Sequence, residues 1–70
     1  MTVREKEILQ FIIDFKRTNG YSPTTKEIMI GVNTRSRNFV EMAVGRLADE
    51  GYITIKPRSP RTIVVKKFIS

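Results

Sequence analysis

The chain has 70 residues, the size of one small domain, and contains neither cysteine nor histidine. That composition excludes disulfide frameworks, Cys/His zinc sites and catalytic dyads built on a thiol or an imidazole. No apolar run approaches the ~20 residues that span a bilayer, and the N-terminus carries no hydrophobic signal segment. We therefore expect a cytoplasmic protein without enzymatic activity, metal, cofactor, small-molecule ligand or membrane contact.

Charge is the informative bulk property. The sequence carries 13 Lys and Arg residues against 7 Asp and Glu residues, for a net charge of +6. The excess is uneven, since residues 31–70 hold eight cations and three anions. Such a surface favours a polyanionic partner, although small domains are often basic for solubility alone. The position of the charges in the fold must decide between the two interpretations.

The first segment predicts a long helix over residues 3 to about 18. Thr2 and Glu5 fit the capping-box pattern, and apolar residues such as Ile8 and Ile12 then recur at helical spacing. The pattern ends at Asn19-Gly20, where glycine can adopt the left-handed conformation that closes a helix. The apolar side of this helix is expected to form core.

A shorter helix is expected over about residues 25–31. Pro23 holds the residue before it in an extended conformation, which favours a very short strand at Tyr21-Ser22. Thr24 and Thr25 are both suitable N-caps for the helix that follows, and Gly31 is expected to end it.

The next helix, about residues 36–50, is expected to have two faces of different character. Val40, Val44 and Leu47 follow the i, i+4, i+7 spacing of a buried stripe, with more polar positions opposite them. Ser36 is a good N-cap, and an arginine stands on each side of it. A capped N-terminus with free N–H groups and nearby cations suits a phosphate backbone and a base edge. Together with the shorter helix, this segment predicts a helix-turn-helix.

After Gly51 the apolar period changes from 3.6 to 2. The runs Tyr52–Lys56 and Thr62–Lys66 flank a basic loop with two prolines, which predicts a β-hairpin over about residues 52–66. Three helices followed by this hairpin, with Tyr21-Ser22 as an optional third strand, are in the order of a winged helix-turn-helix. We expect one domain over residues 1–70, mainly α with a small β-hairpin (α+β), whose antiparallel wing has two or three strands.

Four stretches, EILQFIIDF, GYSPTTKEI, SRNFVEMAVGRLADEGYI and RTIVV, resemble the N-terminal DNA-binding domain of the LexA repressor family. The resemblance runs from about Thr2 to Val65. It implies a winged-helix fold and sequence-specific binding of duplex DNA, with the third helix in the major groove. By matching motif, the positions where that family's reading helix meets DNA are Ser36, Asn38 and Glu41, with Phe39 and Met42 as neighbours and Arg58 or Arg61 in the wing.

The sequence departs from the family pattern in three ways. The turn at residues 31–35 is about two residues longer, and Phe39 and Met42 are apolar where such helices usually carry small or polar groups. The linker and the self-cleaving C-terminal domain of the full repressors are missing. We therefore expect a stand-alone domain, of a kind that suits a phage or mobile-element regulator, with an operator different from that of its relatives.

Five residues of the third helix are expected to read bases: Arg37, Asn38, Phe39, Glu41 and Met42. An outward Asn can bond to adenine N6 and N7, a carboxylate can accept from cytosine N4, and an apolar side chain can contact a thymine methyl group. The alternative for Glu41 is an ion pair with a neighbouring arginine. For Phe39 and Met42 it is packing against the turn or against a partner subunit.

A second group is expected to contact the DNA backbone or to belong to the wing. Its members are Thr24, Thr25, Lys26, Thr34, Arg35, Ser36, Arg46, Arg58 and Arg61. The expected function is that of a small, nucleoid-associated transcription repressor that binds double-stranded DNA sequence-specifically. It is expected to act as a homodimer on a pseudo-palindromic site. The alternative is a winged-helix module that binds another protein and does not read DNA, motivated by Phe39 and Met42.

Overall fold

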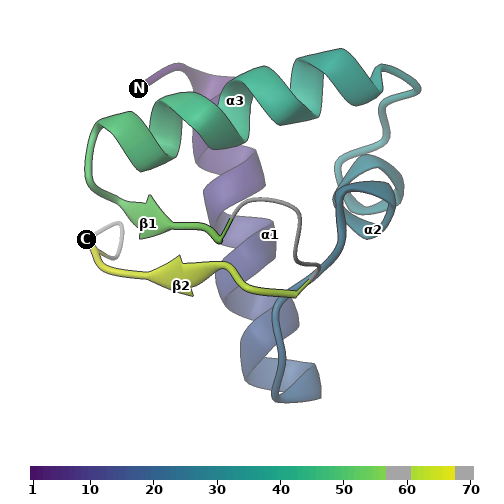
Figure 1. Cartoon of the computed structure of the whole chain (residues 1–70). Coiled ribbons are helices and arrows are strands. Elements are labelled where there is room, and N and C mark those ends of the chain that lie inside the picture. The colour runs from purple at the N-terminus through teal and green to yellow at the C-terminus, as the bar shows by residue number, and fades with distance from the viewer. Residues whose placement is uncertain (57–60, 68–70) are drawn as a thin grey trace.

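The computed structural model describes residues 1–56 and 61–67 and consists of three helices followed by a two-stranded antiparallel hairpin (Figure 1). The helices are α1 (Val3–Asn19), α2 (Thr25–Gly31) and α3 (Arg37–Asp49), and the strands are β1 (Ile53–Thr54) and β2 (Val64–Val65). This order is that of a winged helix, as the sequence predicted. Within the described ranges, no helix combines the length and the apolarity needed to cross a membrane.

Helix α1 begins and ends where its caps predicted, to within one residue. The Thr2 hydroxyl accepts from the N–H of Glu5, and the Glu5 carboxylate accepts from the N–H of Thr2, so both arms of the capping box form. At the other end Gly20 has φ 82° and donates to the carbonyl of Lys16 at 2.8 Å. These caps satisfy backbone groups that a helix leaves open at its ends.

Helix α2 has the expected bounds, but the threonines before it and the glycine at its end act differently from the prediction. Thr24 alone is the N-cap, and it forms a second capping box with Glu27. Gly31 is the last helical residue and has no positive φ, whereas Asn33 takes the left-handed conformation at φ 56°. Gly31 is instead required by packing, because a Cβ at this position would overlap the ring of Phe11.

Helix α3 crosses α1 and buries one side against it (Figure 1). Ser36 caps it by accepting from the N–H of Phe39 at 3.0 Å. The buried residues of α3 are Val40, Ala43 and Leu47, while Val44 is only partly buried. The core that these residues join draws on all three helices and β1: Ile8, Leu9, Ile12, Ile13, Ile28, Val32, Val40, Ala43, Leu47 and Ile53.

The hairpin is shorter than its sequence pattern predicted. Among the residues that the structure describes, two pairs form, Ile53 with Val65 and Thr54 with Val64. Beyond them Thr62 replaces the backbone ladder, since its hydroxyl accepts from the N–H of Lys56 and donates to the Lys56 carbonyl. The predicted runs of five residues were therefore wrong in extent, because side-chain bonds complete the pairing.

The optional third strand at Tyr21-Ser22 does not form among the described residues, which contain a two-stranded sheet. Ser22 is nevertheless tied to the hairpin, since its buried hydroxyl accepts from the N–H of Ile63 at 3.2 Å. A single side chain thus makes the connection that a strand would have made through its backbone.

Candidate functional site

Helix α3 presents three sides around its buried stripe, as the 3.6-residue period requires. Asn38 and Met42 lie on the outer side and are exposed, Met42 by 55%. Their only mutual contact is a weak one, from the Asn38 amide to the Met42 sulfur at 3.5 Å. Both side chains are therefore available to a partner that approaches the outer side of α3.

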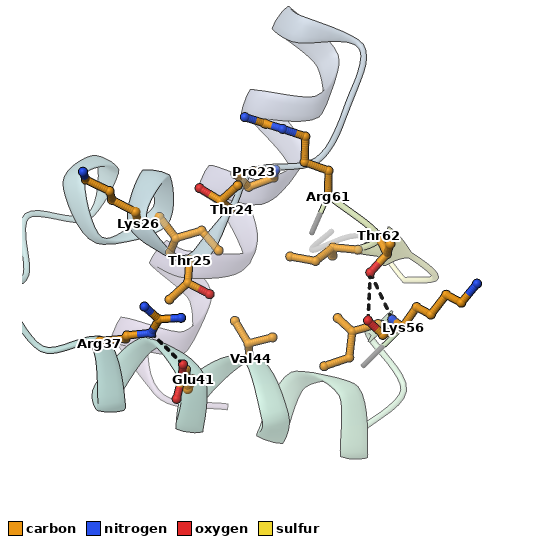
Figure 2. A pocket seen from close by; sticks show the side chains of 13 residues that line it. Pro23, Thr24, Thr25, Lys26, Arg37, Glu41, Val44, Lys56, Arg61 and Thr62 are labelled. Carbon is orange, nitrogen blue, oxygen red and sulfur yellow. Dashed lines mark hydrogen bonds and ion pairs between the residues drawn. The ribbon is translucent and has the colours of Figure 1, made fainter. Parts of the chain in front are cut away.

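One flank of α3 forms a wall of an open groove of about 620 Å³ (Figure 2). The start of α2 and the hairpin form its other walls, so three elements meet at one hollow. The residues that line it are Pro23, Thr24, Thr25, Lys26, Ile28, Arg37, Glu41, Val44, Ile55, Lys56, Arg61, Thr62 and Ile63. The fold thereby places four of the predicted contact residues, Thr24, Thr25, Lys26 and Arg61, opposite α3.

The rim of this groove is predominantly basic. Arg37 and Glu41 form an ion pair at 2.9 Å across one turn of α3, which is the alternative that the sequence offered for Glu41 (Figure 2). Among the described residues no carboxylate pairs with Lys26 or Lys56, which line the groove, or with Arg35, which precedes α3. Cations without partners at such a rim attract an anionic backbone more strongly than paired ones do.

The opposite flank of α3 faces the start of α1. Phe39 is partly buried against the core, and the Arg4 guanidinium lies 5.3 Å from its ring centroid. Arg46 lies about two turns further along α3, and one of its guanidinium nitrogens is 3.5 Å from the buried carboxylate of Glu5. The ring of Phe39 thus packs within the chain itself, while its contact with a base stays a prediction.

Several predicted contact residues already use their side chains inside the domain. Thr34 accepts from the N–H of Ser36 at 3.2 Å, and the hydroxyls of Ser36 and Thr24 cap their helices. A hydroxyl that accepts one bond can still donate another, so these residues keep one group for a phosphate. Arg58 lies outside the described residues.

Arg61 was predicted to extend from the wing toward DNA, but it is bound within the domain. Its two terminal nitrogens lie 2.9 and 3.2 Å from the two oxygens of Glu27, and one of them also donates to the Ser22 carbonyl. Its guanidinium lies 4.5 Å from the ring centroid of Tyr21. The backbone N–H of Thr24 and the guanidinium of Arg61 lower the pKa of the Glu27 carboxyl below its ordinary value.

The sequence did not predict that Tyr21, Ser22 and Glu27 are the partners of Arg61. A local signal existed, because Thr24 and Glu27 have capping-box spacing and this places Glu27 on the first turn of α2. Its partner lies 34 positions away in the chain, so no pattern in the sequence indicated the pairing.

Three packed helices, an outward third helix and a hairpin that closes a basic groove beside it define a winged helix-turn-helix DNA-binding domain. The model of the LexA DNA binding domain matches residues 1–62, and the chain therefore belongs to the LexA DNA-binding domain family.

Full repressors are among the proteins that the chain resembles. The LexA repressor of Carboxydothermus hydrogenoformans is 37% identical over 60 residues, which are 86% of this chain and 29% of that protein. The LexA repressors of Geobacillus thermodenitrificans and Staphylococcus aureus (strain USA300) are each 35% identical over 65 residues, 93% of this chain and 31% of theirs. The chain thus spans about three tenths of the length of these relatives.

Proposed function

We propose that this chain is a sequence-specific binder of double-stranded DNA that represses transcription by covering its site, and that its function is binding and not catalysis. One observation carries the proposal: the outer side of α3 stands beside a groove whose rim holds Lys26, Arg37 and Lys56. Relatives that match nearly the whole chain are named LexA repressors, which supports the same function.

The outer side and the groove flank of α3 are the parts that we assign to the major groove. Arg37 suits guanine O6 and N7, Asn38 suits adenine N6 and N7, Glu41 can accept from cytosine N4, and Met42 can contact a thymine methyl group. A good bidentate pair contributes about 1 to 3 kcal/mol of discrimination against a wrong base. We leave Phe39 out of this set, because its ring packs on the chain itself.

The DNA backbone is assigned to the residues around this helix, which would fix the register of α3 without reading sequence. Arg35 and Ser36 stand at the start of α3, with Thr34 just before them, and Thr25 and Lys26 stand across the groove. Arg46 is assigned to a flanking phosphate, and Arg58 of the wing to a phosphate or the minor groove.

Selection of bound duplexes from a random DNA pool, followed by titration of the selected duplex against a scrambled one, tests the proposal. We expect recovery of a defined sequence and a steep loss of affinity with salt, with a log-log slope near −0.9 for each phosphate neutralised. No enrichment, together with equal binding of selected and scrambled duplexes at low salt, would refute sequence-specific binding.

A lone reading helix covers a single half-site, so we also propose that two copies bind a pseudo-palindromic site at the nucleoid. Sedimentation of the chain with the selected duplex should then give two protein molecules for each DNA molecule. A strict 1:1 complex on every high-affinity duplex would contradict this arrangement.

One observation favours a second function, a module that binds a protein. Met42 is a large apolar side chain that is 55% exposed on the outer side of α3. Under that function Met42→Asp abolishes partner binding, and the combined change Arg35→Ala and Arg37→Ala has little effect. Under DNA binding, the arginine changes are the damaging ones.

A further inference from the structure

We propose that Arg61 is a positioning residue, which binds Glu27, Ser22 and Tyr21 as a clamp and thereby fixes the hairpin beside α3, and that it is not itself a contact to DNA. The inference rests on the proposed function, and it assigns to this arginine a role in specificity that differs from the phosphate contact that its place in the wing suggests. The clamp is defined here as these four residues.

The hairpin needs such an attachment because its own ladder is short. β1 and β2 share two residue pairs, and a two-stranded hairpin of this size is marginal by itself. Thr62 joins the two arms to each other through Lys56. The position of the hairpin relative to α2 and α3 therefore depends on contacts that leave the hairpin.

Ile53 buries its side chain in the core, and Arg61 supplies the polar side-chain contacts from the hairpin to α2 and to the segment before it. Its guanidinium meets the Glu27 carboxylate with two nitrogens on two oxygens, at 2.9 and 3.2 Å, which is the planar fork that arginine makes and lysine cannot. It also donates to the Ser22 carbonyl at 3.2 Å and stacks over Tyr21 at 4.5 Å. Two residues further on, the N–H of Ile63 donates to the Ser22 hydroxyl.

The backbone of Arg61 agrees with a fixed role. Its φ is 58°, a left-handed conformation that a residue other than glycine adopts only when its surroundings hold it there. In Figure 2 the guanidinium extends past Pro23 and Thr24 at the edge of the groove, while the Lys56 side chain extends outward from the hairpin side of the rim.

Glu27 connects the clamp to the reading geometry. The carboxylate that receives Arg61 also accepts from the N–H of Thr24 at 2.8 Å and so closes the capping box of α2. Lys26 stands next to it and lines the groove opposite Arg37. Loss of the clamp would remove the polar attachment of the hairpin wall to α2 while leaving the cations of the other walls in place.

The experiment compares Arg61→Gln, Glu27→Gln, the double variant and Arg61→Lys with the unaltered chain. The probes are the duplex selected by the unaltered chain and a scrambled duplex of equal length, and the readouts are the ratio of their Kd values and the salt slope. Glutamine at position 27 still suits a capping box, so this change removes the ion pair and keeps the cap. Urea unfolding of each variant verifies that it is folded under the binding conditions.

The clamp predicts that Arg61→Gln and Glu27→Gln each lower the specificity ratio by about tenfold, and that the double variant is no worse than either. Arg61→Lys should lower the ratio as well, although it keeps the charge, and the salt slope should stay unchanged throughout. A direct phosphate contact predicts the reverse: Arg61→Gln flattens the slope by about 0.9, Arg61→Lys binds like the unaltered chain, and Glu27→Gln tightens binding.

The reverse pattern, additive losses, or unchanged ratios in all variants would each overturn the clamp while leaving the proposed function in place. If the unaltered chain itself bound both duplexes equally, the proposed function would fail, and the role of Arg61 in specificity with it. The behaviour of the unaltered chain therefore separates the two failures.

Discussion

Gly31 at the end of α2 lies against the ring of Phe11 in α1, so closely that a Cβ added to the glycine would overlap three ring atoms. This contact explains a glycine in a helical conformation that other residues adopt readily. It also sets how near α2 approaches α1, and α2 in turn forms one wall of the groove beside α3.

We expect Gly31→Ala to lower the free energy of unfolding by about 1 to 3 kcal/mol, because the added methyl group overpacks the α1–α2 contact. Urea unfolding measures the change, and Phe11→Leu in the same chain should recover part of it. Gly45→Ala is the matched control, since no atom outside the adjoining backbone of α3 lies within 4 Å of the added Cβ. That change should stabilise the domain by about 0.5 to 1 kcal/mol, and a loss of stability at Gly45 would contradict the packing argument.

Thr24→Ala should reduce stability by about 1 kcal/mol, because it removes the hydroxyl that accepts from the N–H of Glu27. Thr25→Ala, one residue further along, removes a hydroxyl that has no capping bond and should change stability by less than about 0.5 kcal/mol. Thermal unfolding of the two variants at one pH gives the comparison. Equal losses would show that the capping box does not stabilise α2.

Stability should depend on pH through Glu27. The folded chain holds the pKa of this carboxyl below the ordinary value of 4.5. The ionised carboxylate therefore contributes fully to the free energy of unfolding above that pH, and this contribution is lost as the pH falls through the folded-state pKa. Urea unfolding from about pH 7 to about pH 3 should show a steeper loss for the unaltered chain than for Glu27→Gln.

Glu50→Gln is the control for that titration, since it also removes one carboxylate but at an exposed position with no ion pair to a described residue. It should follow the unaltered chain in this acidic range more closely than Glu27→Gln does. Identical curves for the unaltered chain and Glu27→Gln would mean that the clamp contributes nothing to folding.

Two residues near the start of α3 should separate backbone contact from base reading. Arg35→Gln is expected to weaken binding similarly for all sequences and to reduce the magnitude of the salt slope by about 0.9, as loss of one phosphate contact requires. Asn38→Ala should keep the slope and lose about 1 to 3 kcal/mol of discrimination at a single base pair. Titrations of the selected duplex and its single-base variants measure the salt slope and the discrimination. If Arg35→Gln changed the discrimination and Asn38→Ala changed the slope, Arg35 would be the base reader and Asn38 the backbone contact.

Most local features of this protein follow from the sequence by itself. Thr2 with Glu5, Thr24, Ser36 and Gly20 mark helix ends because a cap acts on backbone groups two to four residues away. The order of three helices and a hairpin, and the motifs of the LexA family, follow from such short-range patterns and from the spacing of apolar residues.

The tertiary structure alone decided which face each side chain meets. Phe39 turns toward α1, Arg61 turns back onto Glu27, and Gly31 is needed by Phe11, although the sequence assigned the first two to DNA and the third to a helix end. In each case the partner lies at least 20 positions away in the chain. A cation, an aromatic ring or a glycine carries no local mark of such a partner, because a long-range contact is fixed by how the elements pack and not by the residues beside it.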